Sequence, residues 1–404
     1  MGTNNSIKFF LLFLMIIINL SCNQREKRVL YADQIVTINH EDINKSTIET
    51  ASNYVEDIEY IPLETNDFNL IGEISKLILS AKYIYVCDKN TNSLYQFTRK
   101  GNYIRTIGVV GNGPNEYIKI SSFAVNQATQ NIAIYCEFKQ SIIEFNEEGI
   151  PLSEKKIGFI CSDFIYYGDS YLFYGGRMPN ENIFKETFPQ QYRLVVIQDG
   201  AVTKEYLPFE YNEILLKTSI TSDKNCLFTH DDKIKLVERC NGIVHEITTD
   251  SISAMYAVNF GNYNIPVDFY SGDININEGT IQKIEKGKYC RLSLFLETKD
   301  YIYVDYIISH YENMVSACLY SKRTKESFNI GPLWINDVEN ISMPNFLTIY
   351  ENYFVGYYDA YELKTMLITN KNPLSEKMKN INREIDDTSN PVICIMKFKD
   401  SLDK

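Results

Sequence analysis

Histidine is scarce in this chain, and the motifs that depend on it are missing. Only four histidines occur among 404 residues, His40, His230, His245 and His310, and no H-E-x-x-H or paired-histidine metal motif is present. The sequence also lacks the G-x-S-x-G nucleophile turn, the Walker A phosphate loop and the G-x-G-x-x-G dinucleotide motif. We therefore predict no catalytic residue, no metal and no cofactor, and favour a chain that is not an enzyme.

Positive charge is in deficit. The chain has 52 acidic and 40 basic residues, a net charge of −12 at pH 7, and no cluster of lysines and arginines. Nucleic acids and anionic lipid surfaces are bound by clustered basic patches that release counterions. The composition therefore argues against a nucleic-acid partner.

Long apolar runs are missing except at the start of the chain. Residues 9–20 form a run of about twelve apolar residues, whereas roughly 20 are needed to span a hydrocarbon core of about 30 Å. With Lys8 before it and Ser21-Cys22 after it, this run predicts a lipoprotein signal peptide over residues 1–21 and lipid attachment at Cys22. An ordinary secretory signal cleaved nearby is the alternative.

The residues after Cys22 indicate where the protein would be held. Residues 22–52 are polar and predict a tether, and residues 53–404 form the folded domain. The segment 23–27 lacks the acidic run common after the cysteine of surface-exported lipoproteins. We therefore expect a lipid anchor in the cell envelope, on the outer membrane, with the periplasmic side favoured over the surface.

The other eight cysteines show neither metal spacing nor an obvious pairing. They occur singly, without a C-x-x-C, and most lie within apolar, strand-like runs. We interpret them as small buried hydrophobic residues. A disulfide framework is the alternative, and Cys226 with Cys240 is the first pair to test.

The sequence does contain two similar stretches that predict short strands. Apolar runs at residues 84–86, 94–97 and 103–107 are separated by turn residues such as Asp, Asn and Gly. The pattern of residues 84–101 returns 48 residues later, at 132–149. A strand repeat of this length is typical of a β-propeller, in which each blade is one four-stranded antiparallel sheet.

The first of these stretches also resembles a known family. The pattern V-x-D-x-x-x-N-x-L-x-x-F-x-x-x-G over residues 86–101, followed by Gly111-Asn-Gly-Pro-Asn-Glu-Tyr117, resembles an NHL-type repeat. More closely, it is similar to the six-bladed propeller lipoproteins common in Bacteroidetes. The resemblance implies a six-bladed fold and a cell-envelope location, and it implies no substrate.

The rest of the chain can be divided into blades by its strand-like runs. We place the six blades at about 71–108, 117–158, 159–209, 213–266, 281–331 and in the remainder to 398, with seven blades as the competing count. In the last blade we expect a strand at 364–369, followed by a short helix within 372–385. Residues 54–63 and 392–398 are expected to pair in this blade, because an open ring would leave an unpaired edge.

Long loops indicate a binding face. In a four-stranded blade, the loop joining the second and third strands emerges on the same side as the loop that leads to the next blade. The longest predicted loops lie on this side, and their candidate ligand-binding residues are Arg177, Phe184, Phe188, Tyr270, His310, Tyr311 and Trp334. The alternative is that Phe184, Phe188 and Trp334 only cap the blade cores.

These observations lead to one preferred function and one alternative. We predict a lipid-anchored envelope propeller that acts as a non-catalytic binding or scaffolding module. Its partner would be a protein, peptide or glycan bound on the long-loop side. The alternative is an envelope lyase or hydrolase that acts on a glycan or peptide in the funnel of the ring.

Overall fold

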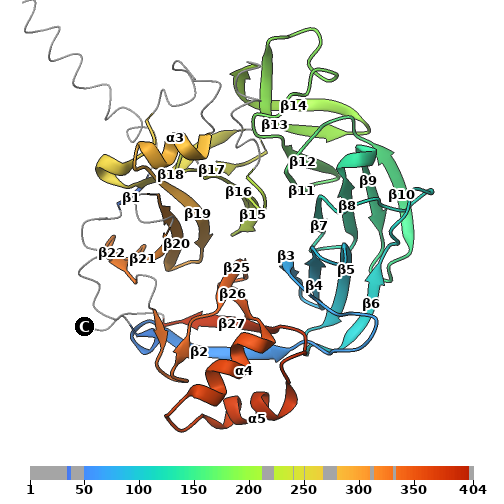
Figure 1. The fold of residues 1–404 in the computed structure, drawn as a ribbon. Coiled ribbons are helices and arrows are strands. Elements are labelled where there is room, and N and C mark those ends of the chain that lie inside the picture. Colours follow the sequence, from blue (N-terminus) through green and yellow to red (C-terminus); the bar gives the residue numbers. More distant parts are fainter. Residues whose placement is uncertain are drawn as a thin grey trace, which may run out of the picture.

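Six four-stranded blades form a ring in the computed structural model of the protein (Figure 1). The structure describes residues 34–37, 50–211, 223–239, 241–249, 251–266, 280–309, 314–330 and 334–399. In each blade four strands pair antiparallel. In blades one to five these four strands are neighbours in sequence and the first of them lies innermost. The prediction of a six-bladed β-propeller is therefore confirmed, and the count of seven is wrong.

The first three blades follow the repeat seen in the sequence. Blade one consists of β3 (Ile74–Leu79), β4 (Tyr83–Asp88), β5 (Ser93–Thr98) and β6 (Tyr103–Ile107). Blade two consists of β7 (Ser122–Val125), β8 (Ile132–Cys136), β9 (Ser141–Phe145) and β10 (Pro151–Lys156). Blade three consists of β11 (Asp163–Tyr167), β12 (Ser170–Tyr174), β13 (Gln190–Gln198) and β14 (Ala201–Glu210).

The next two blades have less regular edges. Blade four consists of β15 (Leu227–His230), β16 (Lys233–Glu238), β17 (Ile243–Ile247) and β18 (Ile252–Asn259). Blade five consists of β19 (Cys290–Glu297), β20 (Tyr301–Ile308), β21 (Met314–Ser321) and the short β22 (Ser327–Asn329). A small hairpin of β23 (Ile335–Asn336) and β24 (Ile341–Ser342) follows blade five.

Blade six closes the ring with strands from both ends of the chain. Its order is β25 (Asn345–Tyr350), β26 (Tyr353–Tyr358), β27 (Val392–Phe398) and β2 (Val55–Pro62). The register runs antiparallel from Val55 opposite Phe398 to Pro62 opposite Val392. The predicted pairing of residues 54–63 with 392–398 is confirmed.

A fifth strand, β1 (Gln34–Thr37), extends blade four. It pairs in parallel with the outer strand β18, and its Val36 is fully buried. These residues belong to the segment for which the sequence predicts a polar tether. Two adjacent apolar residues, Ile35 and Val36, between polar ones are too short a signal to distinguish a strand from a linker.

The helices lie in the connections between strands. They are α3 (Thr280–Lys286), α4 (Ala360–Thr369) and α5 (Glu376–Glu384), with 3-10 turns at Ala51–Asn53, Glu137–Lys139 and Gly261–Tyr263. The helix expected within 372–385 is confirmed as α5. No helix in the described part of the chain is long and apolar enough to cross a membrane.

The strand expected at residues 364–369 is wrong, because these residues belong to α4. The Asp359 carboxylate caps this helix by accepting a hydrogen bond from the Tyr361 backbone N–H. Leu363 and Leu367 stand four residues apart and are both buried against blade six. A short apolar run does not separate a strand from a buried helix turn, and the third strand of this blade is β27.

The hydrophobic core is divided among the boundaries between blades. Each of the six boundaries holds one cluster of buried side chains. Between blades one and two, for example, Tyr85, Phe123 and Phe145 are at most 1% exposed. Burial of this kind is worth roughly 1.5–3 kcal/mol for each large side chain. Each blade is therefore stabilised by two neighbours rather than by an internal core.

Glycine is required where the closing strand meets blade one. Gly101 has a φ of +87°, and a Cβ atom there would lie 2.1 Å from the carbonyl oxygen of Pro62 at the end of β2. The Gly101 carbonyl in turn accepts a hydrogen bond from the backbone N–H of Glu64. The hairpin turn of blade one thus packs directly on the closing strand.

Removing β27 tests ring closure. A chain truncated after Asn390 should aggregate or remain unfolded, since the strand is hydrogen-bonded on both sides and Val392–Met396 are buried. A chain that ends at Lys399 keeps every pairing of β27 and serves as the control. Sedimentation and thermal unfolding measure both. A monomeric chain of unchanged stability after Asn390 would contradict this account of closure.

Candidate functional site

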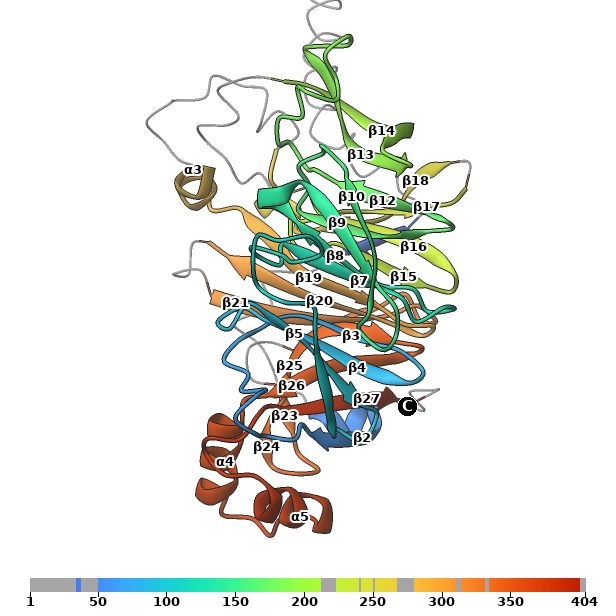
Figure 2. The same cartoon turned by 90° about the vertical axis from the view of Figure 1, so that its right-hand side faces the viewer.

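One face of the ring carries the longer connections, and we call it the long-loop face. Its connections are the loops from the second to the third strand of each blade and those from an outer strand to the next inner strand. They include 63–73, 108–121, 137–140, 175–189 and 359–391, the last of which contains α4 and α5. In Figure 2, α3 and α4 project from the left-hand side of the ring, whereas β27 ends on the right.

Asp163 lies at the centre of the ring on this side. It is the first residue of the inner strand β11, and its side chain is 1% exposed. Its Oδ1 accepts hydrogen bonds from Lys76 Nζ at 2.7 Å and Ser122 Oγ at 2.7 Å. Its Oδ2 accepts hydrogen bonds from the backbone N–H groups of Cys226 and Leu227 at 2.9 and 3.0 Å. One carboxylate therefore joins the inner strands of blades one to four.

A further bond crosses the axis of the ring. Asn225 Nδ2, just before the inner strand of blade four, donates to the Ser75 carbonyl of blade one at 2.7 Å. Blades one and four stand opposite each other in a ring of six. Together with the Asp163 network, this bond links the inner strands of blades one to four across the axis at the long-loop face.

A second buried carboxylate, Glu238, lies between blades three and four. Its oxygens contact the Arg193 guanidinium, His245 Nε2 at 3.0 Å and Asn241 Nδ2 at 2.8 Å. Burial alone would raise its pKa, but Arg193 and these hydrogen bonds outweigh that effect and lower the pKa to about 2. Glu238 is thus held as a buried anion.

Nearby Asp223 shows the opposite shift. Its carboxylate accepts a hydrogen bond from the Arg239 backbone N–H. Burial outweighs the nearby arginines and raises the pKa of Asp223 to about 6. Two carboxylates at the same blade boundary therefore differ in charge state in mildly acidic solution.

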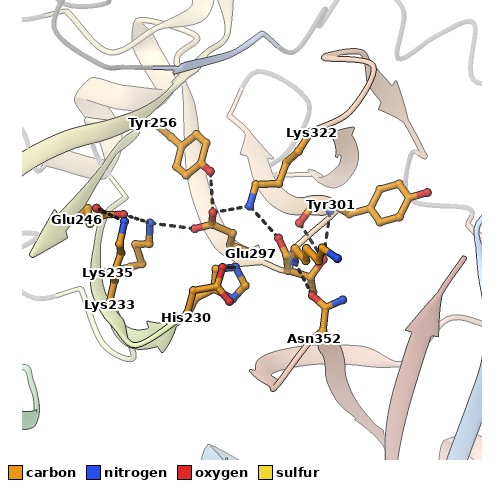
Figure 3. A network of polar contacts seen from close by, with 12 residues as sticks. His230, Lys233, Lys235, Glu246, Tyr256, Glu297, Tyr301, Lys322 and Asn352 are labelled. Carbon is orange, nitrogen blue, oxygen red and sulfur yellow. Dashed lines mark hydrogen bonds and ion pairs between the residues drawn. The ribbon is translucent and has the colours of Figure 1, made fainter. Parts of the chain in front are cut away.

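A third charged network joins blades four and five at the opposite ends of their inner strands (Figure 3). Glu297 Oε1 accepts hydrogen bonds from Tyr256 at 2.6 Å and Lys322 at 2.7 Å, and Lys235 Nζ lies 3.4 Å from its other oxygen. Burial would raise the pKa of Glu297, but the hydrogen bonds and the two lysines lower it below its usual value. His230, at the end of β15, lies beside this network, and burial lowers its pKa.

The structure separates the predicted ligand-binding residues into three groups. Phe184 is 3% exposed and packs on Phe159, and Trp334 is 5% exposed and stacks on Tyr303, so both belong to blade cores. Their burial favours the alternative in which they cap the blades. Tyr270, His310 and Tyr311 lie outside the described residues, as does Cys22.

Two of the predicted residues remain accessible on blade three. Phe188 is half exposed, and its ring lies 5.6 Å from that of Tyr211. The Arg177 guanidinium lies 6.0 Å from the ring of Phe209. Both residues come from the connection 175–189, so an aromatic and a cationic side chain share this part of the long-loop face.

The sequence analysis missed a set of apolar side chains on the same face. Six of the thirteen exposed large apolar side chains in the described part of the chain lie on three neighbouring connections of blades one and two. These are Phe68, Leu70, Val109, Val110, Ile118 and Phe138. The loop Gly111–Tyr117 was predicted to lie on this side of the ring, and it was the signal that could have located these apolar residues, which were not predicted.

Cysteine and metal chemistry find no support in the described residues. Seven cysteines there are buried free thiols: Cys87, Cys136, Cys161, Cys226, Cys290, Cys318 and Cys394. Burial raises the pKa of Cys318 to about 12, so its thiol stays protonated. Cys240, proposed as a partner for Cys226, lies outside the described residues. No group of three His, Cys, Asp or Glu side chains in the described ranges could hold a metal ion.

Comparisons with known proteins place the chain by family and by fold. Residues 34–397 match the model of a family described as "Domain of unknown function (DUF4934)". This range begins at the first residue of β1 and ends within β27, so it includes all six blades and the added strand. No curated protein matches the chain.

Two solved structures illustrate the likeness. A protein described as exported, from Bacteroides fragilis NCTC 9343, superposes with a TM-score of 0.74 at 18% identity, covering 91% of this chain and 100% of its own. A member of the DUF4221 family from Bacteroides vulgatus ATCC 8482 gives a TM-score of 0.46 at 11% identity, covering 86% and 98%. The first likeness shows a shared fold.

Replacing Lys76 tests the central network. Lys76→Met should lower the free energy of unfolding by about 3 kcal/mol or more, because it leaves Asp163 buried without its counter-ion. Lys155→Met is the control, since Lys155 and Asp199 form an exposed pair at 3.6 Å, and it should cost less than about 1 kcal/mol. Urea unfolding measures both. Equal losses in the free energy of unfolding for the two variants would mean that the Lys76–Asp163 pair contributes little to stability.

The Glu238 network should make stability depend on pH in a defined window. The pKa of Glu238 is about 2 in the folded state and near 4.5 in the unfolded state. The ionised Glu238 carboxylate therefore stabilises the fold above pH 4.5, and this contribution is lost as the pH falls toward 2. The pH-dependent difference between wild type and Glu238→Gln should therefore shrink by about 3 kcal/mol over this window. Glu73→Gln, at an exposed pair with Lys89, is the control and should show little change. A constant difference for Glu238→Gln would contradict the assignment.

Proposed function

The chain belongs to the DUF4934 family, and from that premise we propose that it is a non-catalytic binding or scaffolding module anchored by lipid in the cell envelope. The family description supplies no reaction and no ligand. The proposal therefore rests on the geometry of the ring and on the N-terminal sequence.

The direct bonds across the axis of the ring are the observation that favours binding over catalysis. Propeller enzymes work on substrates that enter a funnel around the axis, and the alternative of a lyase or hydrolase needs such a funnel. Here Lys76, Asp163 and Asn225 join blades one to four by direct bonds at the long-loop face. A ligand would then be recognised by the outer part of the long-loop face and by the loops there.

The N-terminal sequence supports export and anchoring. The apolar run at residues 9–20, followed by Leu20-Ser21-Cys22, fits a lipoprotein signal. The similar structure from Bacteroides fragilis is described as an exported protein, which fits the same destination. We therefore propose lipid attachment at Cys22 and a location on the outer membrane, with the periplasmic side favoured.

Changing Cys22 to Ser tests the anchor. Cys22→Ser should move the protein from the membrane fraction to the soluble fraction, because the thiol that would carry the lipid is absent. Cys87→Ser, at a buried thiol within β4, is the control and should leave the protein in the membrane fraction. Unchanged fractionation of Cys22→Ser, with residues 1–21 retained, would contradict the proposal.

Elemental analysis of the purified protein separates the two functions. The binding module should contain no stoichiometric transition metal. A metal bound in a one-to-one ratio would favour the lyase or hydrolase alternative.

A further inference from the structure

Six exposed apolar side chains gather over blades one and two, and we call them the blade-one patch. They are Phe68, Leu70, Val109, Val110, Ile118 and Phe138. Phe68 is 79% exposed and Phe138 is 70% exposed. Single exposed apolar side chains are ordinary on a protein surface, but a group of six on adjoining loops marks a place where something binds.

Hydrogen bonds between the loops bring these side chains together. Asn92 donates to the Ile118 carbonyl and accepts from the Ile120 backbone N–H. Lys139, next to Phe138, donates to the carbonyls of Gly113 and Glu116. These bonds join the connections 108–121 and 137–140 to each other and to the β4–β5 turn of blade one.

The glycine-rich motif holds this surface rigid. Glu116 Oε2 accepts a hydrogen bond from the Gly113 backbone N–H at 2.8 Å. A Cβ atom on Gly111 would lie 2.0 Å from the same oxygen, so only glycine leaves room for it. Beneath the motif, Tyr117 is fully buried between blades one and two.

Asp88 fixes the neighbouring loop in the same way. Its carboxylate accepts hydrogen bonds from the backbone N–H groups of Gly72, Glu73 and Thr91. The backbone that carries Phe68 and Leu70 is therefore tied to the turn of blade one. A surface that is already ordered loses little conformational entropy when it binds, which favours recognition.

Charge indicates what covers the patch. Acidic side chains exceed basic ones among those exposed on its loops. They are Glu64, Asp67, Glu73 and Glu137 against Lys119, and of these acidic residues Glu73 is paired with Lys89. Neither Asp67 nor Glu137 forms an ion pair with another described residue. A second copy of this chain, with its net charge of −12, would place like charges against them.

The added strand β1 argues that the patch does not rest on the membrane. The outer strand β18 runs toward the long-loop face, and β1 is parallel to it. The first residue of β1, Gln34, therefore lies toward the opposite side of the ring. An anchor at Cys22 would then place the membrane on that side.

We propose that the blade-one patch docks a different protein, one that presents apolar anchor residues flanked by basic ones. The inference deepens the proposed binding function, on which it rests. Val110 and Phe138, on two loops that Lys139 joins, supply apolar contacts, and the acidic side chains of these loops select the basic flanks.

A phage-displayed library of random peptides tests this proposal. Purified protein carrying Cys22→Ser, which leaves every described residue unchanged, should enrich peptides that combine aromatic or aliphatic residues with Lys or Arg. Val110→Asp and Phe138→Asp should weaken binding of these peptides about tenfold or more, a cost of about 1.4 kcal/mol. Thermal unfolding should be unchanged, since both side chains are exposed.

Two control variants show where binding occurs. Leu152→Asp changes an exposed apolar residue on the β9–β10 hairpin, away from the patch, and should leave affinity unchanged. Phe188→Asp changes the accessible aromatic residue of blade three, the other candidate binding position, and tests whether the peptides bind there instead. Binding lost in Phe188→Asp but kept in Val110→Asp would overturn the patch while the binding function stands. Failure to enrich any peptide would count against both.

Two further measurements test whether a second copy of this chain or a membrane covers the blade-one patch instead. Sedimentation of the Cys22→Ser protein should show a monomer, and dimerisation abolished by Phe138→Asp would mean that a second copy covers the patch. Flotation with vesicles of phosphatidylethanolamine and phosphatidylglycerol should leave this protein unbound. Binding to these vesicles that depends on Phe138 would overturn the proposal in favour of the membrane.

Discussion

Pairing of β2 with β27 is the constraint on which the other contacts depend. Every core cluster lies between two blades, so a blade without a neighbour exposes an apolar face and an unpaired strand edge. The closing strand supplies side chains to the clusters on both sides of blade six, through Ile58 and Ile61. The two ends of the chain are therefore coupled, and the ring folds as one cooperative unit rather than as six independent sheets.

Buried carboxylates lie at several boundaries between blades and contribute to the pairing of the correct neighbours. Asp163, Glu238 and Glu297 each contact groups from at least two blades. A buried ion pair contributes little net stability over a well-packed apolar pair, because desolvation offsets the Coulomb attraction. Such pairs can instead select one partner, since any other neighbour leaves a charge unsatisfied. Apolar blades of similar shape would otherwise be interchangeable.

Local patterns predicted the regular parts of this fold well. The repeat over residues 84–149 located blades one and two because turn residues and strand-like runs are signals contained in a short window. Ring closure was predictable from a global argument, the need to pair both edges. By contrast, α4 and β1 were missed, because a segment of four to six residues with two or three apolar ones shows too little periodicity to fix an element type. Long-range contacts decided both, with α4 packing on blade six and β1 on blade four.

The candidate site was less predictable, because the sequence does not show which loop side chains are buried. The side of the ring that carries the long loops followed from strand order alone. Whether an aromatic side chain in such a loop faces solvent depends on contacts distant in sequence: Phe184 packs on Phe159, and Trp334 packs on Tyr303. Exposure of Val110 and Phe138 likewise follows from how Glu116 and Lys139 fold the loops. The Phe184–Phe159 and Trp334–Tyr303 contacts have no local sequence signal, whereas the Gly113–Glu116 contact lies within one short motif.

Strand β1 also limits the distance that an N-terminal linker can span. A linker over residues 22–52 would extend up to roughly 100 Å if fully stretched, at about 3.4 Å per residue. Because β1 fastens the chain to blade four at Gln34, only the eleven residues 23–33 separate it from Cys22. Their greatest span is about 37 Å, which is comparable to the thickness of a bilayer. A lipidated molecule would thus stand close to the surface with little freedom to tumble, and partners would meet a face presented in a fixed direction.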